Sequence, residues 1–509
     1  MENPPLNLGK RIMSENQRKK IVLVRSGCKG GYVHIPLSIL YLAEALMKNG
    51  YEPRLVDLRV QELVPEDLEN VLYMGVSHMT GSMQIPPALK CASLAKEMGV
   101  PVVFGGPHAS ILPEQTAAHP LVDIAVKGDG EQVAVELAQY FQGQRSLASI
   151  KSIAYKDSLG KVIFTGDRKP PSFDQTALLP YELLSMDKYL ATSADFDFQT
   201  SRGCPHHCTF CAEISLFGHS WRAKPAHVLI EEIESVISKY NPSRICIVDS
   251  NFFCNKKRVK EFCELIIERG IKTRFFAECR FDYFSKYEDE FLYLLKKAGF
   301  TEIEFGGESG SNVTLARIKK DISSEQILQS IKKCRETGLK SFTSFMIGFP
   351  EETDEQMMET LNIYDQMRHL NPSGVRINGM FIYSPFPGTE LYNNVVERHG
   401  FVPPKDLDSW AKFELYDSKH ASWLDESKKK ELQTVSIIVR YFFTFKTIMD
   451  WNFREKIIRH RGFTKAILSL VFNGILYPFA RLRWKLKVFK YGIEWRIWRK
   501  IFCLYMGQK

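Results

Sequence analysis

Residues 199–213, QTSRGCPHHCTFCAE, decide how the rest of the chain is interpreted. Three cysteines in this stretch, Cys204, Cys208 and Cys211, form a C-x3-C-x2-C array. Cysteine thiolates are the usual ligands of iron–sulfur clusters, and such soft ligands also suit zinc and Cu(I). Three closely spaced thiolates can hold three irons of a [4Fe–4S] cluster and leave the fourth iron open. This open position distinguishes the array from four-cysteine electron carriers and from closed zinc sites.

The residues around the cysteines favour a cluster site over two alternatives. Those alternatives are three buried free thiols, or a zinc knuckle completed by His206 or His207. Gly203 and Pro205 predict an irregular loop, which can wrap around a cluster. Phe210 stands between the last two cysteines, where we expect it to shield the cluster from water. The spacing, the apolar strand before the array and the pattern after it all agree with a cluster.

The array resembles the signature of the radical S-adenosylmethionine (radical SAM) superfamily. In that superfamily an aromatic residue precedes the last cysteine, as Phe210 does here. The resemblance implies that Cys204, Cys208 and Cys211 bind a [4Fe–4S] cluster. Its open iron then binds the amino and carboxylate groups of S-adenosylmethionine, and one electron releases a 5′-deoxyadenosyl radical. An electron donor such as flavodoxin or ferredoxin is therefore expected.

The length and composition of the chain indicate a globular protein of two or three domains. The chain has 509 residues, of which 44% are hydrophobic and 25% charged, as in ordinary globular proteins. Its 11 cysteines are an odd number and too few for a disulfide scaffold. The polar first twenty residues do not resemble a secretory signal. We therefore expect an anaerobic, reducing cytoplasm, which an oxygen-sensitive cluster also needs.

Residues 20–145 are expected to form a separate α/β domain after a flexible arm at 1–19. Short apolar runs alternate there with helical patterns, which is typical of a doubly wound, Rossmann-like parallel sheet. In such sheets ligands bind beyond the carboxyl ends of the strands. We expect strands at 21–25, 53–56, 71–76, 102–104 and 124–126, and helices at 36–49, 87–98 and 131–141.

Three loops at the expected carboxyl ends combine glycines with polar residues: 75–80 (GVSHMT), 105–108 (GGPH) and 128–131 (GDGE). Glycines there allow a flat ligand to approach the backbone, although each loop alone is also an ordinary turn. Ahead of a radical SAM signature, the arrangement resembles the cobalamin-binding domain of cobalamin-dependent radical SAM proteins. The resemblance implies cobalamin contacts from Ser77, His78, Thr80, Gly105, Gly106, His108, Gly128 and Glu131.

One departure bears on the cobalt ligand. Cobalamin domains of the methionine-synthase type carry D-x-H-x-x-G, and this motif is absent from residues 20–145. His34 lies in GYVHIPL, without the aspartate or the glycine. The resemblance therefore implies cobalamin without a histidine lower ligand. We expect His78 and His108 to form loop hydrogen bonds instead.

A linker at 146–195 leads to a second β/α region at 196–400. About six β/α units fit an open, partial TIM-type barrel, in which function gathers at the carboxyl ends of the strands. We expect its strands at 196–199, 244–248, 273–278, 302–305, 341–347 and 374–383. Segments 348–353 (GFPEET) and 383–391 (YSPFPGTEL) resemble the adenine-side turn and the ending common in this group.

Five further residues are candidates for binding S-adenosylmethionine. Gly306, Gly307 and Glu308 follow one expected strand, where close backbone and a carboxylate suit an ammonium group. The superfamily uses a similar glycine–glutamate motif. Glu278 and Arg280 could meet a ribose hydroxyl and a carboxylate. The alternatives are a helix N-terminal carboxylate for Glu308 and a strand-end ion pair for Glu278 and Arg280.

The net charge of +9 is concentrated after the barrel. From residue 426 onward there are 19 Lys and Arg against 5 Asp and Glu, or +14, so the preceding chain carries −5. We expect a mainly helical, basic region at 401–509. Its segment 481–500, RLRWKLKVFKYGIEWRIWRK, suits peripheral contact with an anionic membrane, or a helix covering the barrel. Its apolar run 466–480 is too short for a transmembrane helix. Nucleic-acid binding explains this basic charge less well, since no recognised nucleic-acid-binding motif accompanies it.

These observations predict a radical SAM enzyme with cobalamin that methylates an unactivated carbon of a small, lipid-like metabolite. The anaerobic magnesium-protoporphyrin monomethyl ester cyclase shares this architecture, so radical cyclisation or rearrangement is the alternative. A non-catalytic iron–sulfur or membrane-associated protein is the alternative of another class. We expect the remaining cysteines of the barrel to be buried free thiols: Cys246, Cys254, Cys263, Cys279 and Cys334.

Overall fold

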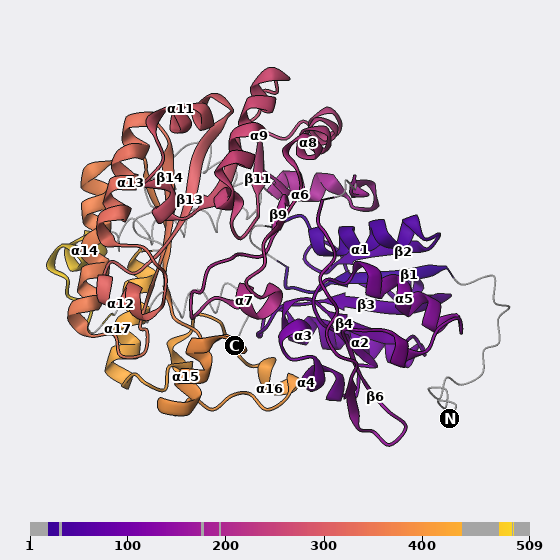
Figure 1. Cartoon of the computed structure of the whole chain (residues 1–509). Coiled ribbons are helices and arrows are strands. Elements are labelled where there is room, and N and C mark those ends of the chain that lie inside the picture. Colours follow the sequence, from indigo (N-terminus) through magenta and orange to yellow (C-terminus); the bar gives the residue numbers. More distant parts are fainter. Residues whose placement is uncertain are drawn as a thin grey trace. The chain divides into compact units, whose positions relative to one another are not determined.

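The computed structural model describes residues 19–29, 33–174, 178–192, 195–439, 478–490 and 492 (Figure 1). Contacts between residues divide the chain into two compact units. The first unit comprises Met1–Pro205, Cys211–Phe276 and Pro403–Leu415, and the second comprises His206–Phe210, Ala277–Val402 and Tyr416–Lys509. Cys204 and Cys211 therefore belong to the first unit, and Cys208 belongs to the second.

The first unit begins with a seven-stranded sheet in the order β2-β1-β3-β4-β5-β6-β7. The expected parallel sheet is confirmed, because β1 through β5 pair in parallel. A hairpin formed by β6 and β7 extends the sheet in antiparallel fashion. The strands are β1 (Lys20–Arg25), β2 (Glu52–Asp57), β3 (Val71–Ser77), β4 (Val102–Gly105), β5 (Ile124–Val126), β6 (Ile153–Lys156) and β7 (Val162–Phe164).

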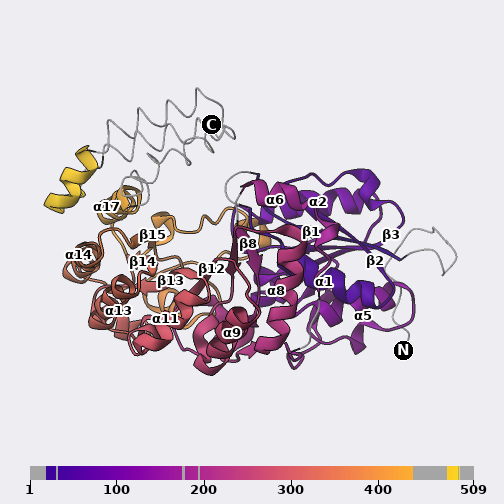
Figure 2. The ribbon, with the colours of Figure 1, turned by 90° about the horizontal axis from the view of Figure 1, so that it is seen from above.

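Helices cover both faces of this sheet, which explains why its central strands are continuous apolar runs. In β1 the residues Ile21, Val22, Leu23 and Val24 are at most 1% exposed. Figure 2 shows α1 and α5 on one face and α2 on the other. The helices are α1 (Leu37–Lys48), α2 (Ile85–Glu97), α3 (Pro107–Ile111), α4 (Pro113–Ala118) and α5 (Glu131–Phe141), with short 3-10 turns at Pro65–Leu68 and Leu147–Ser149.

The order of the strands places a ligand site at one edge of this sheet. The chain goes from β1 to β2 on one side and then returns to β3 on the other. Such a topological switch point leaves a crevice at the carboxyl ends of the strands. The expected glycine loops follow β3, β4 and β5 at this edge.

The first unit continues into the first part of a second β/α region. Strands β8 (Asp195–Phe198) and β11 (Arg244–Ile247) pair in parallel, and a two-residue ladder joins β9 (Ser201–Arg202) to β10 (Arg222–Ala223). The helices are α6 (Met186–Thr192), α7 (Ala212–Phe217), α8 (Ala226–Tyr240), α9 (Lys256–Glu268) and α16 (Leu407–Trp410), with 3-10 turns at Tyr181–Leu183 and Phe252–Cys254.

The second unit contains the remaining β/α elements. Its strands are β13 (Phe300–Glu308), β14 (Lys340–Ile347) and β15 (Val375–Ile382), which pair in parallel, and β12 (Phe275–Cys279) spans the boundary of the units. The strand order β15-β14-β13-β12-β11-β8 gives six strands, as expected for a partial barrel. The helices are α10 (Phe281–Phe284), α11 (Asp289–Lys297), α12 (Asn312–Arg317), α13 (Ser324–Thr337), α14 (Asp354–Leu370), α15 (Glu390–Arg398) and α17 (Glu426–Ile437).

Helix starts in the second unit follow the local sequence. The side chains of Ser323 and Thr353 cap the N-termini of α13 and α14. In each case the side chain of a glutamine three residues later accepts a hydrogen bond from the backbone N–H of the capping residue. Such reciprocal capping satisfies free backbone donors. In the described part of the expected helical region at 401–509, α17 and residues 478–486 are helical. Residues 466–477, 491 and 493–500 of the predicted segments 466–480 and 481–500 lie outside the described residues. Within the described part of the chain, no helix is long and apolar enough to cross a membrane.

Candidate functional site

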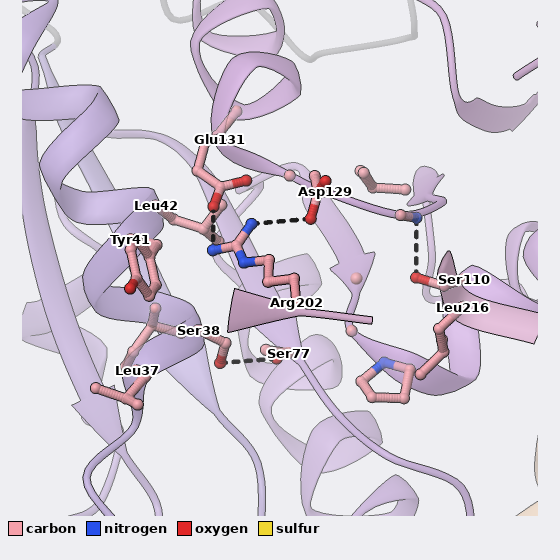
Figure 3. Close-up of a pocket in the computed structure, with 18 of the residues that line it drawn as sticks. Leu37, Ser38, Tyr41, Leu42, Ser77, Ser110, Asp129, Glu131, Arg202 and Leu216 are labelled. Carbon is pink, nitrogen blue, oxygen red and sulfur yellow. Dashed lines mark hydrogen bonds and ion pairs between the residues drawn. The ribbon is translucent and has the colours of Figure 1, made fainter. Parts of the chain in front are cut away.

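A cavity of about 380 Å³ lies in the first unit at the carboxyl ends of the first sheet (Figure 3). Five of the eight residues predicted to contact cobalamin line it: Ser77, Gly105, Gly106, Gly128 and Glu131. Apolar side chains from α1 and α7, such as Leu37, Leu42 and Leu216, complete the wall. The structure therefore brings together the three glycine loops that the sequence placed at separate strand ends.

The other three predicted residues, His78, Thr80 and His108, do not line the cavity and are buried. The His108 Nδ1 and Thr80 Oγ1 atoms are 3.0 Å apart, and His78 Nδ1 contacts the carbonyl oxygen of Met79. Burial lowers the pKa of His78 to about 4 and that of His108 to about 3, so both rings are neutral. Both rings therefore form hydrogen bonds inside the protein, His78 from the end of β3 and His108 from helix α3.

Gly105 and Gly128 leave the cavity open, and Gly128 (φ = +78°) and Gly106 also adopt a backbone conformation that favours glycine. A Cβ on Gly105 would contact only Val126, at 3.9 Å, and one on Gly128 would contact nothing within 4 Å. Gly106 has φ = +89°, and its Cβ would lie 2.8 Å from the His78 carbonyl oxygen. A flat ligand can therefore approach the backbone at Gly105 and Gly128, while Gly106 shapes the turn.

The carboxyl group of Glu213, which is hydrogen-bonded to Ser250, also belongs to the wall of this cavity. Its Oε2 atom is buried without a hydrogen-bond partner among the described residues. A buried acceptor of this kind normally has a donor. The amide side chains of a corrin are such donors, so the residues present fit cobalamin. Sequence reasoning did not identify Glu213, which is marked only by its position two residues after Cys211.

The part of the cysteine loop in the first unit is closed by the β9–β10 ladder. Gly203, at φ = +82°, follows β9, and a Cβ there would overlap the Ser220 carbonyl. Asn251, which is buried, donates from Nδ2 to Cys204 Sγ over 3.5 Å. Cys211 directly precedes α7. An N–H donor directed at a ligand sulfur tunes an iron–sulfur cluster, so Asn251 fits beside a cluster thiolate.

In the second unit, two cations lie close to Cys208. Arg280 Nη1 is 3.7 Å from Cys208 Sγ, and Arg280 Nε pairs with Asp282 at 2.8 Å. Burial raises the pKa of the Cys208 thiol, while the charges of Lys320 and Arg280 oppose this effect. Cations beside a sulfur favour its thiolate form, which is the form that binds metal. The strand-end ion pair considered for Arg280 is made with Asp282, and Glu278 lies partly buried in β12.

The glycine–glutamate motif forms a compact site at the end of β13. Glu308 has φ = +58°, and its Oε1 accepts a hydrogen bond from Lys320 Nζ over 2.8 Å. A Cβ on Gly306 would lie 2.8 Å from Lys320 Nζ, and one on Gly307 would lie 2.7 Å from the ring of Phe345. Glu308 is the last residue of the strand, so the alternative of a helix N-terminal carboxylate is not the arrangement found.

Phe210 lies in the same unit as this motif. Lys320 Nζ is 5.9 Å from the centre of the Phe210 ring, which also contacts Phe349 edge-on at 6.3 Å. Backbone bonds from Thr209 to Ile318 and from Leu391 to Thr209 hold this turn in place. Lys320 was missed by sequence reasoning, because it lies in an ordinary polar segment and meets Glu308 only through the fold.

No group of three or more His, Cys, Asp or Glu side chains in the described part of the chain converges to hold a single metal ion. His206, one candidate for completing a zinc knuckle, instead contacts the hydroxyl of Tyr283. Each thiolate of a [4Fe–4S] cluster binds a different iron, so the three sulfurs need not converge on one point. Cys204, Cys208 and Cys211 form no disulfide, and the N–H donor beside Cys204 and the cations beside Cys208 fit a cluster better than one zinc ion.

Comparison with known protein families gives two matches. The family described as the radical SAM superfamily matches residues 198–363, and the family described as the B12 binding domain matches residues 27–138. Together these segments include the cysteine array, the glycine–glutamate motif and the cavity.

Curated relatives align over most of the chain. An uncharacterized methyltransferase of Pyrococcus horikoshii is 28% identical over 460 residues, covering 87% of this chain and 93% of the relative. The anaerobic magnesium-protoporphyrin IX monomethyl ester cyclase of Rubrivivax gelatinosus is 25% identical over 480 residues, covering 88% and 81%.

Two solved structures share the fold. The cobalamin-dependent S-adenosylmethionine radical enzyme OxsB aligns with a TM-score of 0.70 at 18% identity, over 97% of this chain and 76% of that chain. The radical S-adenosylmethionine methyltransferase TsrM of Kitasatospora setae aligns with a TM-score of 0.62 at 18% identity, over 76% of each chain.

The fold and the sites define a radical SAM enzyme. More specifically, the chain combines a B12-binding domain with a radical SAM domain, and its relatives include methyltransferases and cyclases of this type. Its cofactors are a [4Fe–4S] cluster, S-adenosylmethionine and cobalamin. The predicted family, fold and cofactors are thereby confirmed.

Proposed function

We propose that this enzyme transfers a methyl group to an unactivated carbon of a small, apolar metabolite. The observation that carries the proposal is the cavity beside the cysteine loop. Among its described lining residues none is His, Cys or Met, so the protein offers no ordinary cobalt ligand there. When bound, the cofactors supply a methyl carrier and an adenosyl radical, and the protein supplies binding and orientation.

The residues are assigned to three tasks. Cys204, Cys208 and Cys211 hold the cluster, with Asn251 and Arg280 directed at two of the sulfurs. Gly306, Gly307 and Glu308 receive the amino group of S-adenosylmethionine, because a buried carboxylate beside glycine backbone favours an ammonium ion. Phe210, Glu278 and Arg280 complete that site. The cavity lined by Ser77, Gly105, Gly106, Gly128 and Glu131 receives cobalamin.

The first test is a chemical analysis of protein purified without oxygen. We expect iron, sulfide and cobalt, and a corrin absorption spectrum that is absent after cobalamin-free preparation. A preparation that binds iron but does not take up hydroxocobalamin would contradict the assignment of the cavity. Flavodoxin and ferredoxin are compared as electron donors in the same assay, because the reaction class needs a reductant.

Product analysis separates methylation from cyclisation. A methylase that uses a second S-adenosylmethionine to restore its methyl carrier must form S-adenosylhomocysteine as well as 5′-deoxyadenosine. A cyclase or rearranging enzyme forms 5′-deoxyadenosine without S-adenosylhomocysteine. Protein that retains its cluster but forms neither product under reducing conditions would contradict both, and would favour a non-catalytic iron–sulfur protein.

We also propose that the C-terminal region contacts an anionic membrane surface. In the helical residues 478–486, Trp484 is buried and its Nε1 donates to Asp365 over 2.7 Å. Phe479, Leu482 and Leu486 are 54–60% exposed, among several basic residues. Apolar side chains interspersed with cations suit a membrane interface. An enzyme located at a membrane would meet apolar metabolites there, which supports an apolar substrate.

Sedimentation with vesicles tests this contact. Replacing Leu482 and Leu486 by Gln should reduce binding to phosphatidylserine vesicles and leave the Trp484–Asp365 contact in place. Leu159→Gln is the matched control, because Leu159 is 90% exposed in the first unit. Equal binding of all three proteins, or equal binding to neutral vesicles, would refute membrane contact through this helix.

A further inference from the structure

One carboxylate, Asp129, binds both arginines at the base of the cysteine loop. Asp129 Oδ1 pairs with Arg202 Nη1 at 2.8 Å, and Asp129 Oδ2 pairs with Arg222 Nη1 at 2.8 Å. Arg202 and Arg222 are directly paired across the β9–β10 ladder. Residues 203–221, which include the three cysteines, emerge from this ladder. Asp129 therefore holds both ends of the loop at once.

Arg202 is fixed in a single position by its other contacts (Figure 3). Its guanidinium lies against two neighbouring aromatic rings, 4.6 Å from the centre of Tyr41 and 4.5 Å from that of Phe173. Arg202 Nη2 also pairs with Glu131 at 2.6 Å. A planar cation held by two rings and two carboxylates has little freedom to reorient.

Arg222 depends more strongly on Asp129. Besides its ion pair with Asp129, Arg222 donates from Nη1 to the carbonyl oxygen of Pro171 over 2.7 Å. Arg222 Nε and Nη2 are buried and have no hydrogen-bond partner among the described residues. Loss of the Asp129 charge would thus leave a largely buried guanidinium without its counter-charge, which lowers the stability of the fold.

The same contacts form part of the wall of the cavity. Asp129, Glu131, Arg202 and Tyr41 all line it, together with Gly203. A ligand that orders the loop at residues 128–131 must therefore order the carboxylates that hold the base of the cysteine loop. The cavity, Asp129 and both arginines all belong to the first unit.

We propose that Asp129 is a positioning residue that couples occupancy of the cavity to the geometry of the cysteine loop. The inference rests on the proposed binding of cobalamin in this cavity. It assigns the Asp129–Arg202–Arg222 group a role beyond folding, because binding on one side of the group restricts the loop on the other.

Hydrogen–deuterium exchange with and without hydroxocobalamin tests the coupling. In the natural protein, hydroxocobalamin should slow exchange both at residues 128–131 and at the loop base, residues 200–205 and 219–224. In Asp129→Asn, slowing should persist near the cavity but disappear at the loop base. Without ligand, the loop base of this variant should exchange roughly 10-fold faster than in the natural protein.

Glu136→Gln is the matched control. Glu136 also binds two arginines, Arg145 at 2.8 Å and Arg168, within the same domain, but it does not line the cavity. This variant should lose thermal stability and keep the ligand-dependent slowing at the loop base. Asp129→Glu, which keeps the charge, should restore part of the slowing.

The outcomes separate this inference from the proposed function. If hydroxocobalamin binds the natural protein but does not slow exchange at the loop base, the coupling is wrong and the cobalamin site stands. If Asp129→Asn and Glu136→Gln behave alike, the role of Asp129 is only structural and the inference is overturned. If hydroxocobalamin leaves exchange unchanged everywhere in the natural protein, the cobalamin site itself is wrong, and the coupling fails with it.

Discussion

Lys320 Nζ donates a hydrogen bond to Glu308 Oε1 over 2.8 Å, and both side chains are buried at the end of β13. The ammonium group of Lys320 thus forms an ion pair with the Glu308 carboxylate. A buried carboxylate with one oxygen engaged can receive the ammonium group of a ligand through its other oxygen. The contact with Lys320 therefore orients the Glu308 carboxylate to bind an ammonium group in the second unit.

Glu308→Gln should reduce cleavage of S-adenosylmethionine by about 100-fold, because a neutral amide attracts an ammonium group less strongly. It should also destabilise the fold by about 3 kcal/mol, since Lys320 then remains buried without its counter-charge. Formation of 5′-deoxyadenosine and thermal melting measure the two effects.

The double variant Glu308→Gln with Lys320→Met separates stability from binding. Replacing both charges by uncharged side chains should recover most of the stability lost by the single variant. Cleavage of S-adenosylmethionine should remain low. A double variant that regains cleavage together with stability would show that Glu308 has no direct contact with the substrate.

Alanine substitution of Cys204, Cys208 or Cys211 should abolish the cluster in each case, because three thiolates are needed to hold three irons. Iron and sulfide analysis of protein reconstituted without oxygen provides the measurement. Cys263→Ala is the control, since Cys263 is a fully buried free thiol on α9. It should keep the cluster and lose about 1 kcal/mol of stability. A full iron content in any of the three variants would disprove that ligand assignment.

Gly105→Leu should fill the cavity without disrupting the sheet. A Cβ at this position meets only Val126, at 3.9 Å, and the longer side chain then occupies space expected for the corrin. We expect hydroxocobalamin affinity to fall by at least about 10-fold, with a nearly unchanged melting temperature. Spectrophotometric titration measures the affinity.

Gly106→Ala provides the contrast. Gly106 has φ = +89° and a backbone carbonyl 2.8 Å from the added Cβ, so its substitution should destabilise the fold by more than about 1 kcal/mol. If Gly105→Leu binds hydroxocobalamin as tightly as the natural protein, the ligand lies elsewhere.

Burial raises the pKa of Glu352 from 4.5 to about 7. The folded protein therefore binds a proton more tightly than the unfolded chain does. The contribution of Glu352 to the free energy of unfolding is complete below about pH 4.5 and is lost as the pH rises to about 7. The full effect is at most about 3 kcal/mol.

Glu352→Gln mimics the protonated carboxyl, so it should flatten the dependence of melting temperature on pH between about 4.5 and 7. Glu351→Gln is the control, because the Glu351 side chain is 57% exposed. Parallel pH profiles for the natural protein and Glu352→Gln would indicate that Glu352 stays ionised in the fold.

The cysteine array, the glycine loops and the β/α periodicity were readable from the sequence because each is a local pattern. Thiolate spacing indicates a cluster, and short apolar runs between amphipathic helices predict parallel sheets. Gly105 and Gly106 were both recognised as loop glycines, yet only the fold shows that one faces the cavity while the other avoids a backbone clash. His78 and His108 were grouped with the cavity loops, although the backbone turns both of them away from it.

Only the tertiary structure decided which distant side chains meet. Asp129 contacts Arg202 and Arg222, Asn251 contacts Cys204, and Lys320 contacts Glu308. No spacing in the sequence encodes these pairs, because each joins residues of different elements that approach through sheet pairing and loop closure. The sequence by itself determined the class of chemistry through its local ligand pattern. The fold determined which charges surround that chemistry, since burial and counter-charge depend on packing in three dimensions.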